Sequence, residues 1–353
     1  MNQYLSNKLT FFSFWLIFLV VILHSLNIDI EERVDFIYSF QYFVSHRLTQ
    51  IAVPLFFIIA GYLYFLKADI NTSFNVYFFI NNSKKRLRSI VIPFVSWCLF
   101  WFLLMYFLQQ ISFLTGSFSK PLHTVNFEEA LTYMFIEPVN YPFWYLRDLI
   151  FLLILCPLIY LGIKYLKYFS LLILFILPLF YNSLLKVNGY SVLLFIPLFY
   201  FSLGAFLALY KVDLKFTKNY TLVIFAVLLW FALNVFSLYN DIYHKSASLP
   251  FKFLNISKDL VGCFSIWLLY DFFNSKKQWN NFDFYNRSFF IFAVHGIPTM
   301  IIVQLSKKFL VNQYLLFAMF IITPIIVTLI SIFIGSVLKS KTPKLYNIIT
   351  GYR

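Results

Sequence analysis

The sequence predicts an all-α polytopic membrane protein, a bundle of about ten transmembrane helices with both termini in the cytoplasm. The first observation is composition: 61% of the 353 residues are hydrophobic and only 12% are charged, whereas charged residues make up roughly a quarter of a soluble domain. The second is a series of apolar runs of about 17 to 25 residues, each long enough to cross a bilayer. The third is that lysine and arginine gather in alternate connecting segments. We expect one integral-membrane domain over residues 1–353.

The expected spans follow the apolar runs, and charge sets their direction. With the N-terminus placed inside, eighteen lysines and arginines fall on cytoplasmic segments and eight on external segments, which is the bias that determines membrane orientation. The abundant phenylalanine and tyrosine suit lipid-facing surfaces and interfacial belts. The expected spans are residues 9–28, 49–67, 90–109, 143–161, 168–185, 190–210, 219–239, 256–273, 288–306 and 313–337.

Charge and cysteine usage argue against other classes of protein. The net charge of +14 would indicate a nucleic-acid binder in a soluble protein, but here it lies mostly in short loops between apolar runs. We therefore expect membrane lipid, and no nucleic acid, as a partner. Cys98, Cys156 and Cys263 each lie in an apolar run without the spacing of a metal site or redox pair, so we expect no metal and no disulfide framework. Lys8 and the following apolar stretch resemble a signal peptide without a cleavage site, which favours an uncleaved first span.

His24 is the most informative residue of the chain. It lies near the end of the first expected span, and no charged residue occurs within four positions on either side. An ionisable side chain at membrane depth is costly and usually faces a bundle interior or a water-filled cavity. Residue count places His24 about 22 Å from the cytoplasmic face. A partner from elsewhere in the chain is therefore expected.

Two further segments combine apolar and special residues. The second span carries Pro54, which frees a backbone carbonyl one turn earlier, and the small pair Ala60–Gly61, which lets another helix approach closely. The basic run 84–88 follows an aromatic stretch, residues 74–80, and precedes a span. This pattern indicates an interfacial helix feeding a cytoplasmic vestibule. The run either holds phosphates or is only a positive-inside signal.

The segment 141–150 brings charge into the membrane. Trp144 and Tyr145 form an aromatic belt at the outer interface, and Arg147 and Asp148 follow them into the apolar run. Adjacent residues of a helix do not face each other, so we expect Arg147 and Asp148 not to pair well with one another. The alternative is an interfacial arginine anchored to lipid headgroups.

His295 is the second histidine inside an expected span. It lies about 10 Å from the cytoplasmic face by residue count, and Gly296 and Pro298 loosen the helix just beyond it. A buried histidine with satisfied hydrogen bonds is the structural alternative. The other three histidines fall on external segments, where we expect them to be solvated: His46, His123 and His244.

Five segments occur in an order that is specific as a set. They are Val20–Ser25, Val53–Tyr62, Lys85–Pro93, Phe143–Leu149 and Ser288–His295. Together they resemble the membrane acyltransferase-3 family of bacterial integral-membrane O-acyltransferases, over nearly the whole chain. The resemblance implies ten spans with both ends inside, in the inner or plasma membrane of a bacterium. It also implies transfer of an acyl group, usually acetyl from acetyl-CoA, to a hydroxyl of a cell-surface polysaccharide or its lipid-linked precursor.

The resemblance implies roles for particular residues. His24 matches the essential first-span histidine, Arg86 and Arg88 match a cytoplasmic arginine cluster, and Arg147 matches the arginine of a Trp-x-Leu-Arg segment. Phosphates of the donor substrate acyl-CoA would meet Arg86, Arg88 and Lys85, and no cofactor would be held permanently. His24 would deprotonate a sugar hydroxyl or carry the acyl group itself, while Arg147 would stabilise the oxyanion or orient the acceptor. The residues expected around this chemistry or along the acyl path are His295, Asp148 and Tyr62.

Two departures from the family pattern keep other functions open. Many members carry an arginine eleven residues before the histidine, where this chain has Ser13, and often a serine where it has Ala60. One alternative is a glycan or lipid transporter or flippase with His24 and His295 on a proton path; it predicts repeats or paired broken helices, which the sequence does not show. Another alternative is an inactive subunit of a polysaccharide synthesis complex. The presence of Ser13, where many family members have arginine, favours this alternative. Nothing in the sequence indicates the oligomeric state.

Overall fold

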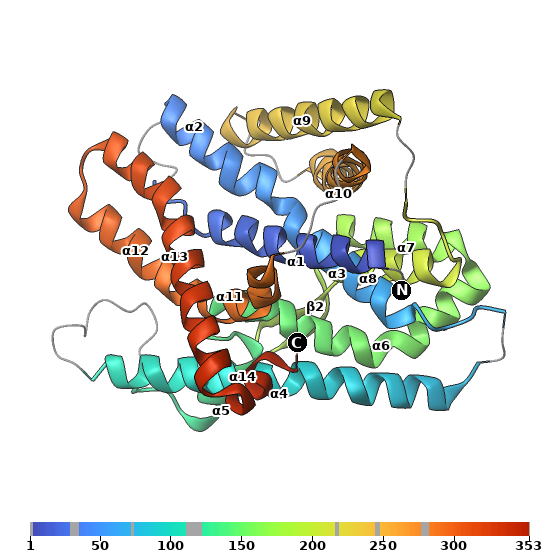
Figure 1. The fold of residues 1–353 in the computed structure, drawn as a ribbon, viewed down its shortest axis with the longest axis horizontal. Coiled ribbons are helices and arrows are strands. Elements are labelled where there is room, and N and C mark those ends of the chain that lie inside the picture. Colours follow the sequence, from blue (N-terminus) through green and yellow to red (C-terminus); the bar gives the residue numbers. More distant parts are fainter. Residues whose placement is uncertain are drawn as a thin grey trace.

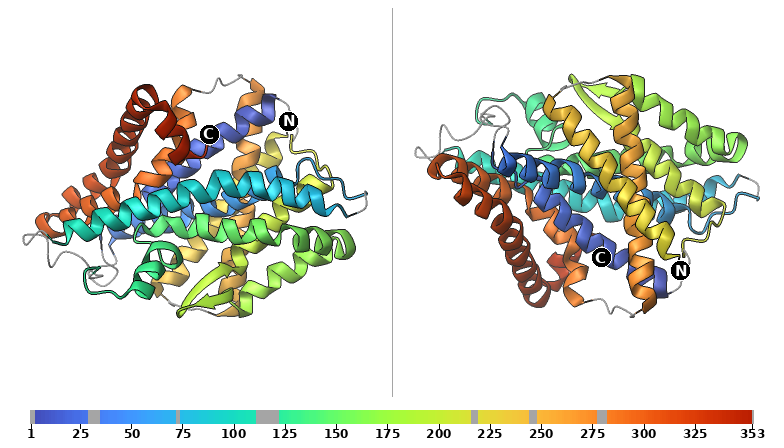
Figure 2. Two further views of the ribbon diagram at one scale, coloured as in Figure 1. Left: turned by 90° about the horizontal axis from the view of Figure 1, so that it is seen from below. Right: turned by 90° about the horizontal axis from the view of Figure 1, so that it is seen from above.

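The computed structural model describes residues 3–28, 35–71, 74–110, 122–215, 219–243, 248–276 and 282–352. Regular structure within these ranges is helical apart from one two-stranded antiparallel sheet (Figure 1). The long helix α4 crosses the whole molecule, with α6 beside it, in the views of Figures 1 and 2. The predicted fold class is therefore confirmed in its main feature.

The elements of the described residues follow one another along the chain in this order. The α-helices are α1 (Gln3–Leu23), α2 (Phe36–Phe43), α3 (Ala52–Phe65), α4 (Val76–Leu108), α5 (Phe127–Leu131), α6 (Trp144–Leu166), α7 (Tyr168–Phe180), α8 (Phe195–Leu209), α9 (Tyr220–Tyr243), α10 (Leu249–Lys276), α11 (Ser288–Val294), α12 (Gly296–Phe309), α13 (Gln313–Lys341) and α14 (Pro343–Thr350). The π- and 3-10-helical turns are η1 (Val44–Leu48), η2 (Thr49–Ile51), η4 (Thr132–Ile136), η5 (Tyr141–Phe143) and η6 (Asp283–Arg287), and the strands are β1 (Ser183–Val187) and β2 (Tyr190–Leu194).

Each of the ten expected spans contains a helix, but not all of these helices have the dimensions of a span. Among the described residues, six segments are long and apolar enough to cross a membrane, and the bent pair α11–α12 would add a seventh. Helices α7 and α8 have only 13 and 15 residues. In Figure 1 helix α10 is seen end-on, whereas α4 is seen from the side along its full length, so the two helices run in different directions. The protein is thus a multi-pass helical membrane protein, while the count of ten spans and the side of the termini stay predictions.

Two expected boundaries were wrong because helices extend further than their apolar cores. Residues 36–48, expected in an external loop, are helical, and Asp35 caps them by accepting a hydrogen bond from the Tyr38 amide at 2.7 Å. Helix α4 runs unbroken for 33 residues from its cap at Asn75. The expected separate interfacial helix is therefore the first turns of α4 itself, and the basic run 84–88 lies on that helix.

A β-hairpin replaces the expected junction between the spans 168–185 and 190–210. Strands β1 and β2 pair antiparallel, and Lys186 and Val187 face Ser191 and Tyr190 across the turn. The turn residues Asn188 and Gly189 both have positive φ, 48° and 83°, which is the backbone that an Asn-Gly hairpin turn requires. The Asn-Gly pair was the sequence signal for this hairpin, and the expectation of purely helical structure overlooked it.

Helices α3 and α8 pack through two glycines. A Cβ atom built at Gly61 would lie 2.0 Å from the carbonyl oxygen of Phe201, and one at Gly204 would lie 1.9 Å from that of Ile58. The predicted close approach of a helix to Ala60–Gly61 is confirmed, and its partner is α8. Small residues are what permit such backbone contact inside a membrane, where van der Waals packing replaces the hydrophobic effect.

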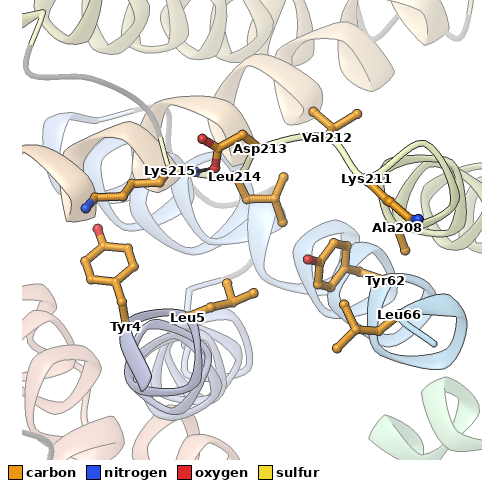
Figure 3. A pocket seen from close by; sticks show the side chains of 10 residues that line it. All are labelled: Tyr4, Leu5, Tyr62, Leu66, Ala208, Lys211, Val212, Asp213, Leu214 and Lys215. Atoms are coloured by element: carbon orange, nitrogen blue, oxygen red, sulfur yellow. Dashed lines mark hydrogen bonds between the residues drawn. The ribbon is translucent and has the colours of Figure 1, made fainter. Parts of the chain in front are cut away.

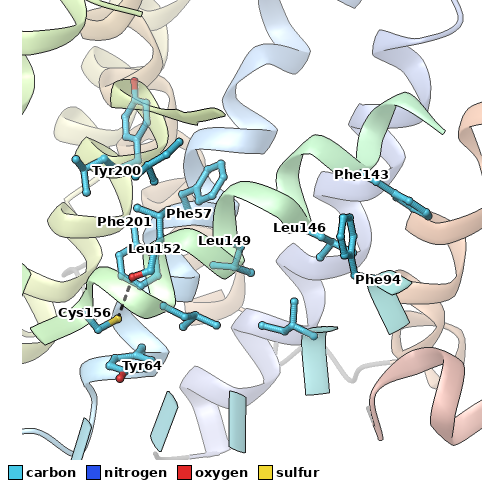
Figure 4. Close-up of a cluster of buried hydrophobic side chains, with 14 of the residues drawn as sticks. Phe57, Tyr64, Phe94, Phe143, Leu146, Leu149, Leu152, Cys156, Tyr200 and Phe201 are labelled. Carbon is cyan, nitrogen blue, oxygen red and sulfur yellow. Dashed lines mark hydrogen bonds between the residues drawn. The ribbon is translucent and has the colours of Figure 1, made fainter. Parts of the chain in front are cut away.

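Around this contact lies the main buried core, formed chiefly by α3, α6 and α8. Figure 4 shows its side chains, with Phe57 of α3 and Tyr200 and Phe201 of α8 beside Leu149 and Leu152 of α6. All five are nearly or completely buried. This core sets the position of α6, and thereby of the charged residues at the start of that helix.

A buried ion pair joins α1 to α10. The Lys8 ammonium lies 2.7 Å from the Asp271 carboxylate and 3.8 Å from the centre of the Trp267 ring, and Lys8 is completely buried. Lys8 therefore belongs to the packed interior. It fixes the beginning of α1, whose other end carries His24.

Candidate active site

Two histidines from distant parts of the chain meet just beyond the C-terminal end of α1, in a region that we call the histidine end. The ring of His24, just after α1, lies 5.7 Å from the ring of His295, centre to centre, and 5.6 Å from the ring of Tyr141, which it meets edge-on. The expected partner for His24 is therefore His295. The expectation that the two histidines lie at different depths was wrong, because the span that carries His295 is not straight.

That span breaks at His295. Helices α11 and α12 meet there at 65°, and the carbonyl oxygen of Ala293, in the last turn before the break, accepts hydrogen bonds from Trp101 Nε1 at 2.9 Å and Asn140 Nδ2 at 3.1 Å. A Cβ atom at Gly296 would lie 2.2 Å from Asn140 Oδ1, so glycine is needed where the chain turns against Asn140. The predicted loosening around Gly296 is thus a sharp, well-packed bend.

The hydrogen bonds of His295 define its tautomer. Its Nδ1 lies 2.8 Å from the carbonyl oxygen of Phe292 and 3.1 Å from that of Ile291. A carbonyl oxygen only accepts, so Nδ1 carries the proton and Nε2 is left as an acceptor. The residue is completely buried, and Nε2 has no hydrogen-bond partner among the described residues. His295 therefore offers an available lone pair close to His24.

Arg147 and Asp148 form a buried ion pair, contrary to expectation. Arg147 Nε donates to Asp148 Oδ1 at 2.9 Å and Nη2 lies 2.8 Å from the same oxygen, because the long arginine side chain curls back to its neighbour. Asp148 also accepts from the backbone amides of Leu193 and Leu194, at 3.3 and 3.0 Å. Arg147 further donates to the carbonyl oxygens of Ile136 and Ser191.

The pair therefore ties three segments together. It connects the start of α6 to the end of η4 and to strand β2, and it supports Leu193, a buried residue whose φ is +53°. Nε and both Nη atoms of Arg147 thus each make at least one of these contacts, so most of its five N–H donors are already engaged.

A pocket of about 230 Å³ adjoins this pair. Its lining residues are Glu137, Pro138, Tyr141, Trp144, Arg147, Ser191 and Leu194. Tyr141 links the pocket to His24. Burial, then Tyr133 and last Glu137 raise the pKa of Tyr190 on the neighbouring strand β2. Glu137 and Asn140 carry no sequence signal of their own, because they precede the expected span 143–161, and Tyr141 belongs to the segment 141–150 without an expected role in it. Gly296 and Pro298 are the sequence signals that hint at a break, and thus at a partner segment.

His46 is half-buried, whereas the sequence predicts a solvated position. The π-helical turn η1 carries it, its ring stacks on Tyr42 at 4.9 Å, and its Nδ1 lies 2.8 Å from Ser45 Oγ. The next residue, Arg47, is buried and pairs with Asp241. Exposure is observed for His123, as expected, and His244 lies outside the described residues.

The opposite end, which we call the basic end, holds the expected phosphate-binding residues. Lys85, Arg86 and Arg88 are exposed on the first turns of α4, and Arg86 Nη2 lies 3.4 Å from the carbonyl oxygen of Leu63 at the end of α3. None of the three contacts the histidine end. The length of α1 separates the ends: the 20 residues from Tyr4 to His24 correspond to about 30 Å.

Tyr62 lies at the basic end too, in the wall of a second pocket of about 380 Å³ (Figure 3). Tyr4 and Leu5 of α1, Tyr62 and Leu66 of α3 and the segment 211–215 surround it. Lys211 and Lys215 supply positive charge, and Lys215 lies over the Tyr4 ring at 5.3 Å. In the part of the chain that the structure describes, no group of three or more metal-ligating side chains occurs.

Comparison with known proteins shows the family to which the chain belongs. An acyltransferase domain, that of the acyltransferase-3 family, matches residues 10–339. The chain belongs to this acyltransferase family. It is similar to the succinoglycan biosynthesis protein ExoH of Rhizobium meliloti (strain 1021), with 28% identity over 185 residues that cover 50% of this chain and 46% of ExoH. The match thus spans less than half the length of that relative, and no solved structure gives a significant match.

Proposed function

We propose that this protein is an integral-membrane O-acyltransferase that moves an acyl group, acetyl in our proposal, from cytoplasmic acyl-CoA to a hydroxyl of a cell-surface polysaccharide or its lipid-linked precursor. The observation that carries the proposal is the meeting of His24, His295 and Tyr141 beside a pocket, in a chain that belongs to an acyltransferase family. A relative named for succinoglycan biosynthesis supports a polysaccharide acceptor. We place the enzyme in the inner or plasma membrane of a bacterium.

In the proposed reaction His24 acts as general base. Its imidazole takes the proton of the acceptor hydroxyl while the hydroxyl oxygen attacks the thioester carbonyl carbon. The carbon–sulfur bond then breaks, and the thiolate of CoA takes the proton from His24, so that no proton is gained or lost overall. His295, with its lone pair at Nε2, helps to hold the proton near His24. Arg147 and Asp148 position the pocket wall.

The donor would approach from the basic end. Exposed guanidinium groups at Arg86 and Arg88 suit the phosphates of CoA, and the pocket beside Tyr62, with Lys211 and Lys215, offers a place for its nucleotide part. The flexible pantetheine arm would carry the thioester along α1 toward His24. Because the donor leaves the site after each cycle, this proposal needs no resident cofactor.

The test is the O-acetyl content of the host's surface polysaccharide in a deletion strain that carries either the wild-type protein or His24→Ala. We expect the wild type alone to restore acetylation, and purified wild-type protein to release CoA thiol from acetyl-CoA when acceptor is present. Normal acetylation with His24→Ala would refute the proposal. Unchanged acetylation with reduced glycan export in the deletion strain would support a transporter instead.

A further inference from the structure

The pocket beside Arg147 has the size and chemistry of a subsite for a single sugar ring. Its volume of about 230 Å³ lies below the roughly 300–1,000 Å³ of pockets for drug-sized ligands. We propose that it binds one neutral pyranose ring of the acceptor, with the Glu137 carboxylate accepting hydrogen bonds from sugar hydroxyls and Trp144 covering an apolar face of the ring. This inference rests on the proposed function, since it describes the acceptor of that reaction.

Glu137 is the first argument for a hydroxyl-rich ligand. Its side chain is half-buried in the pocket wall, and its carboxylate forms no hydrogen bond or ion pair with any described residue. The nearest cation in the pocket wall, Arg147, is already paired with Asp148. A carboxylate accepts several hydrogen bonds and donates none, and a sugar presents several O–H donors. Glu137 is therefore available to a ligand in a way that Arg147 is not.

The aromatic residues are the second argument. Trp144 and Tyr141 both line the pocket, and Trp144 is backed by Phe57, whose ring centre lies 6.3 Å away. The C–H face of a pyranose is apolar, and a large aromatic ring covers such a face while polar groups at the edge satisfy the hydroxyls. A pocket for a lipid chain would have no use for a carboxylate that, within the described part of the chain, is left to accept hydrogen bonds from a ligand.

The charge of the pocket selects the kind of sugar that it binds. The position of the pocket beside Tyr141 determines how far the sugar lies from His24. Arg147 and Asp148 cancel one another, so Glu137 leaves the pocket with a net negative charge, which disfavours anionic sugars. Tyr141 lines the pocket and also meets the His24 ring at 5.6 Å. The Tyr141 ring would thus lie between a hydroxyl of the bound sugar and His24, the proposed base.

The test is direct binding to the full-length protein in lipid nanodiscs, followed by saturation-transfer difference NMR. The probes are methyl β-D-glucopyranoside and methyl β-D-galactopyranoside, with methyl β-D-glucuronide as the anionic counterpart. We expect the wild type to bind at least one neutral glycoside and to bind the glucuronide more weakly. Glu137→Gln should weaken neutral binding about tenfold or more, because bonds to a charged acceptor are the stronger ones, and Trp144→Leu should weaken it as well.

The matched control is Glu128→Gln, which changes an exposed glutamate outside the pocket and should bind like the wild type. Comparable melting temperatures of all variants show that folding is kept. The inference is overturned if the wild type binds no neutral glycoside, if Glu137→Gln binds as well as the wild type, or if the glucuronide is preferred. Glycoside binding that depends on Glu137, without acyl transfer from acetyl-CoA, would support the sugar subsite and refute the proposed function. Acyl transfer that is unchanged in Glu137→Gln would support the proposed function and refute the sugar subsite.

Discussion

The histidine end and the basic end of this molecule hold their polar residues in opposite ways. At the histidine end, His295, Asn140, Arg147 and Asp148 are buried and fixed by hydrogen bonds to backbone groups. At the basic end, Lys85, Arg86 and Arg88 are exposed on a continuous helix. Fixed groups suit a reaction that needs set geometry, whereas mobile charges suit the capture and release of a charged substrate. The difference agrees with our proposal that the reaction takes place at the histidine end and that the donor binds at the basic end.

The largest effect is expected at His24. Replacement by alanine should lower acyl transfer by about 10²–10⁴-fold, since a general base contributes that much, without loss of folded protein. The rate of CoA release by purified protein with acceptor present measures it. His123→Ala, at an exposed histidine, is the control and should be active. Equal activity of His24→Ala and His123→Ala would show that the reaction does not take place at the histidine end.

Removal of Asp148 should produce the next largest effect. Asp148→Ala leaves Arg147 buried without its carboxylate and frees the amides of Leu193 and Leu194, and breaking a buried pair costs about 3–5 kcal/mol of stability. Hydrogen exchange in strand β2 and the melting temperature report the change. Asp148→Asn keeps some of the hydrogen bonds, so its hydrogen exchange and melting temperature should lie between those of the wild type and those of Asp148→Ala. Unchanged exchange in β2 would mean that the pair does not hold the hairpin.

The glycine contact between α3 and α8 tests whether the two ends are kept in place by the core between them. Gly204→Ala should lower stability by about 1–3 kcal/mol, because its Cβ has no room beside the Ile58 carbonyl. The control is Gly162→Ala, whose Cβ would meet nothing within 4 Å and should stabilise the helix by about 0.5–1 kcal/mol. Thermal melting in detergent compares them, and equal shifts would contradict the close packing.

The smallest effect is expected at the basic end. Arg86→Gln combined with Arg88→Gln should raise KM for acetyl-CoA about threefold to tenfold and leave kcat nearly unchanged, because exposed charges contribute modestly. High salt should mask the difference between wild type and variant. Lys339→Gln, at an exposed lysine of α13, serves as control. A large fall in kcat with unchanged KM would show that these residues act in the chemistry.

The sequence was sufficient for the helical membrane fold and the family, and it singled out His24 and His295, whose rings the structure brings together, because apolar runs and intramembrane histidines are local signals. It failed where depth or pairing depends on a bend or on a flexible side chain. Residue count put His295 at the wrong depth because it assumes a straight span. Helix geometry argued against a pair between Arg147 and Asp148 because it considers directions and ignores the reach of arginine. The contribution of Glu137 required the fold, since three separate segments form its pocket.

The bend at His295 has a consequence for how the protein is made. The donors that satisfy Ala293 at the break, Trp101 and Asn140, are synthesised well before the bent segment leaves the ribosome. A span broken in the middle is a poor candidate for insertion by itself, since lipid offers nothing to its backbone carbonyls. The Ala293 carbonyl is therefore satisfied only when α4 and the segment before α6 lie beside the bent segment, so the arrangement that brings the two histidines together depends on these earlier parts of the chain.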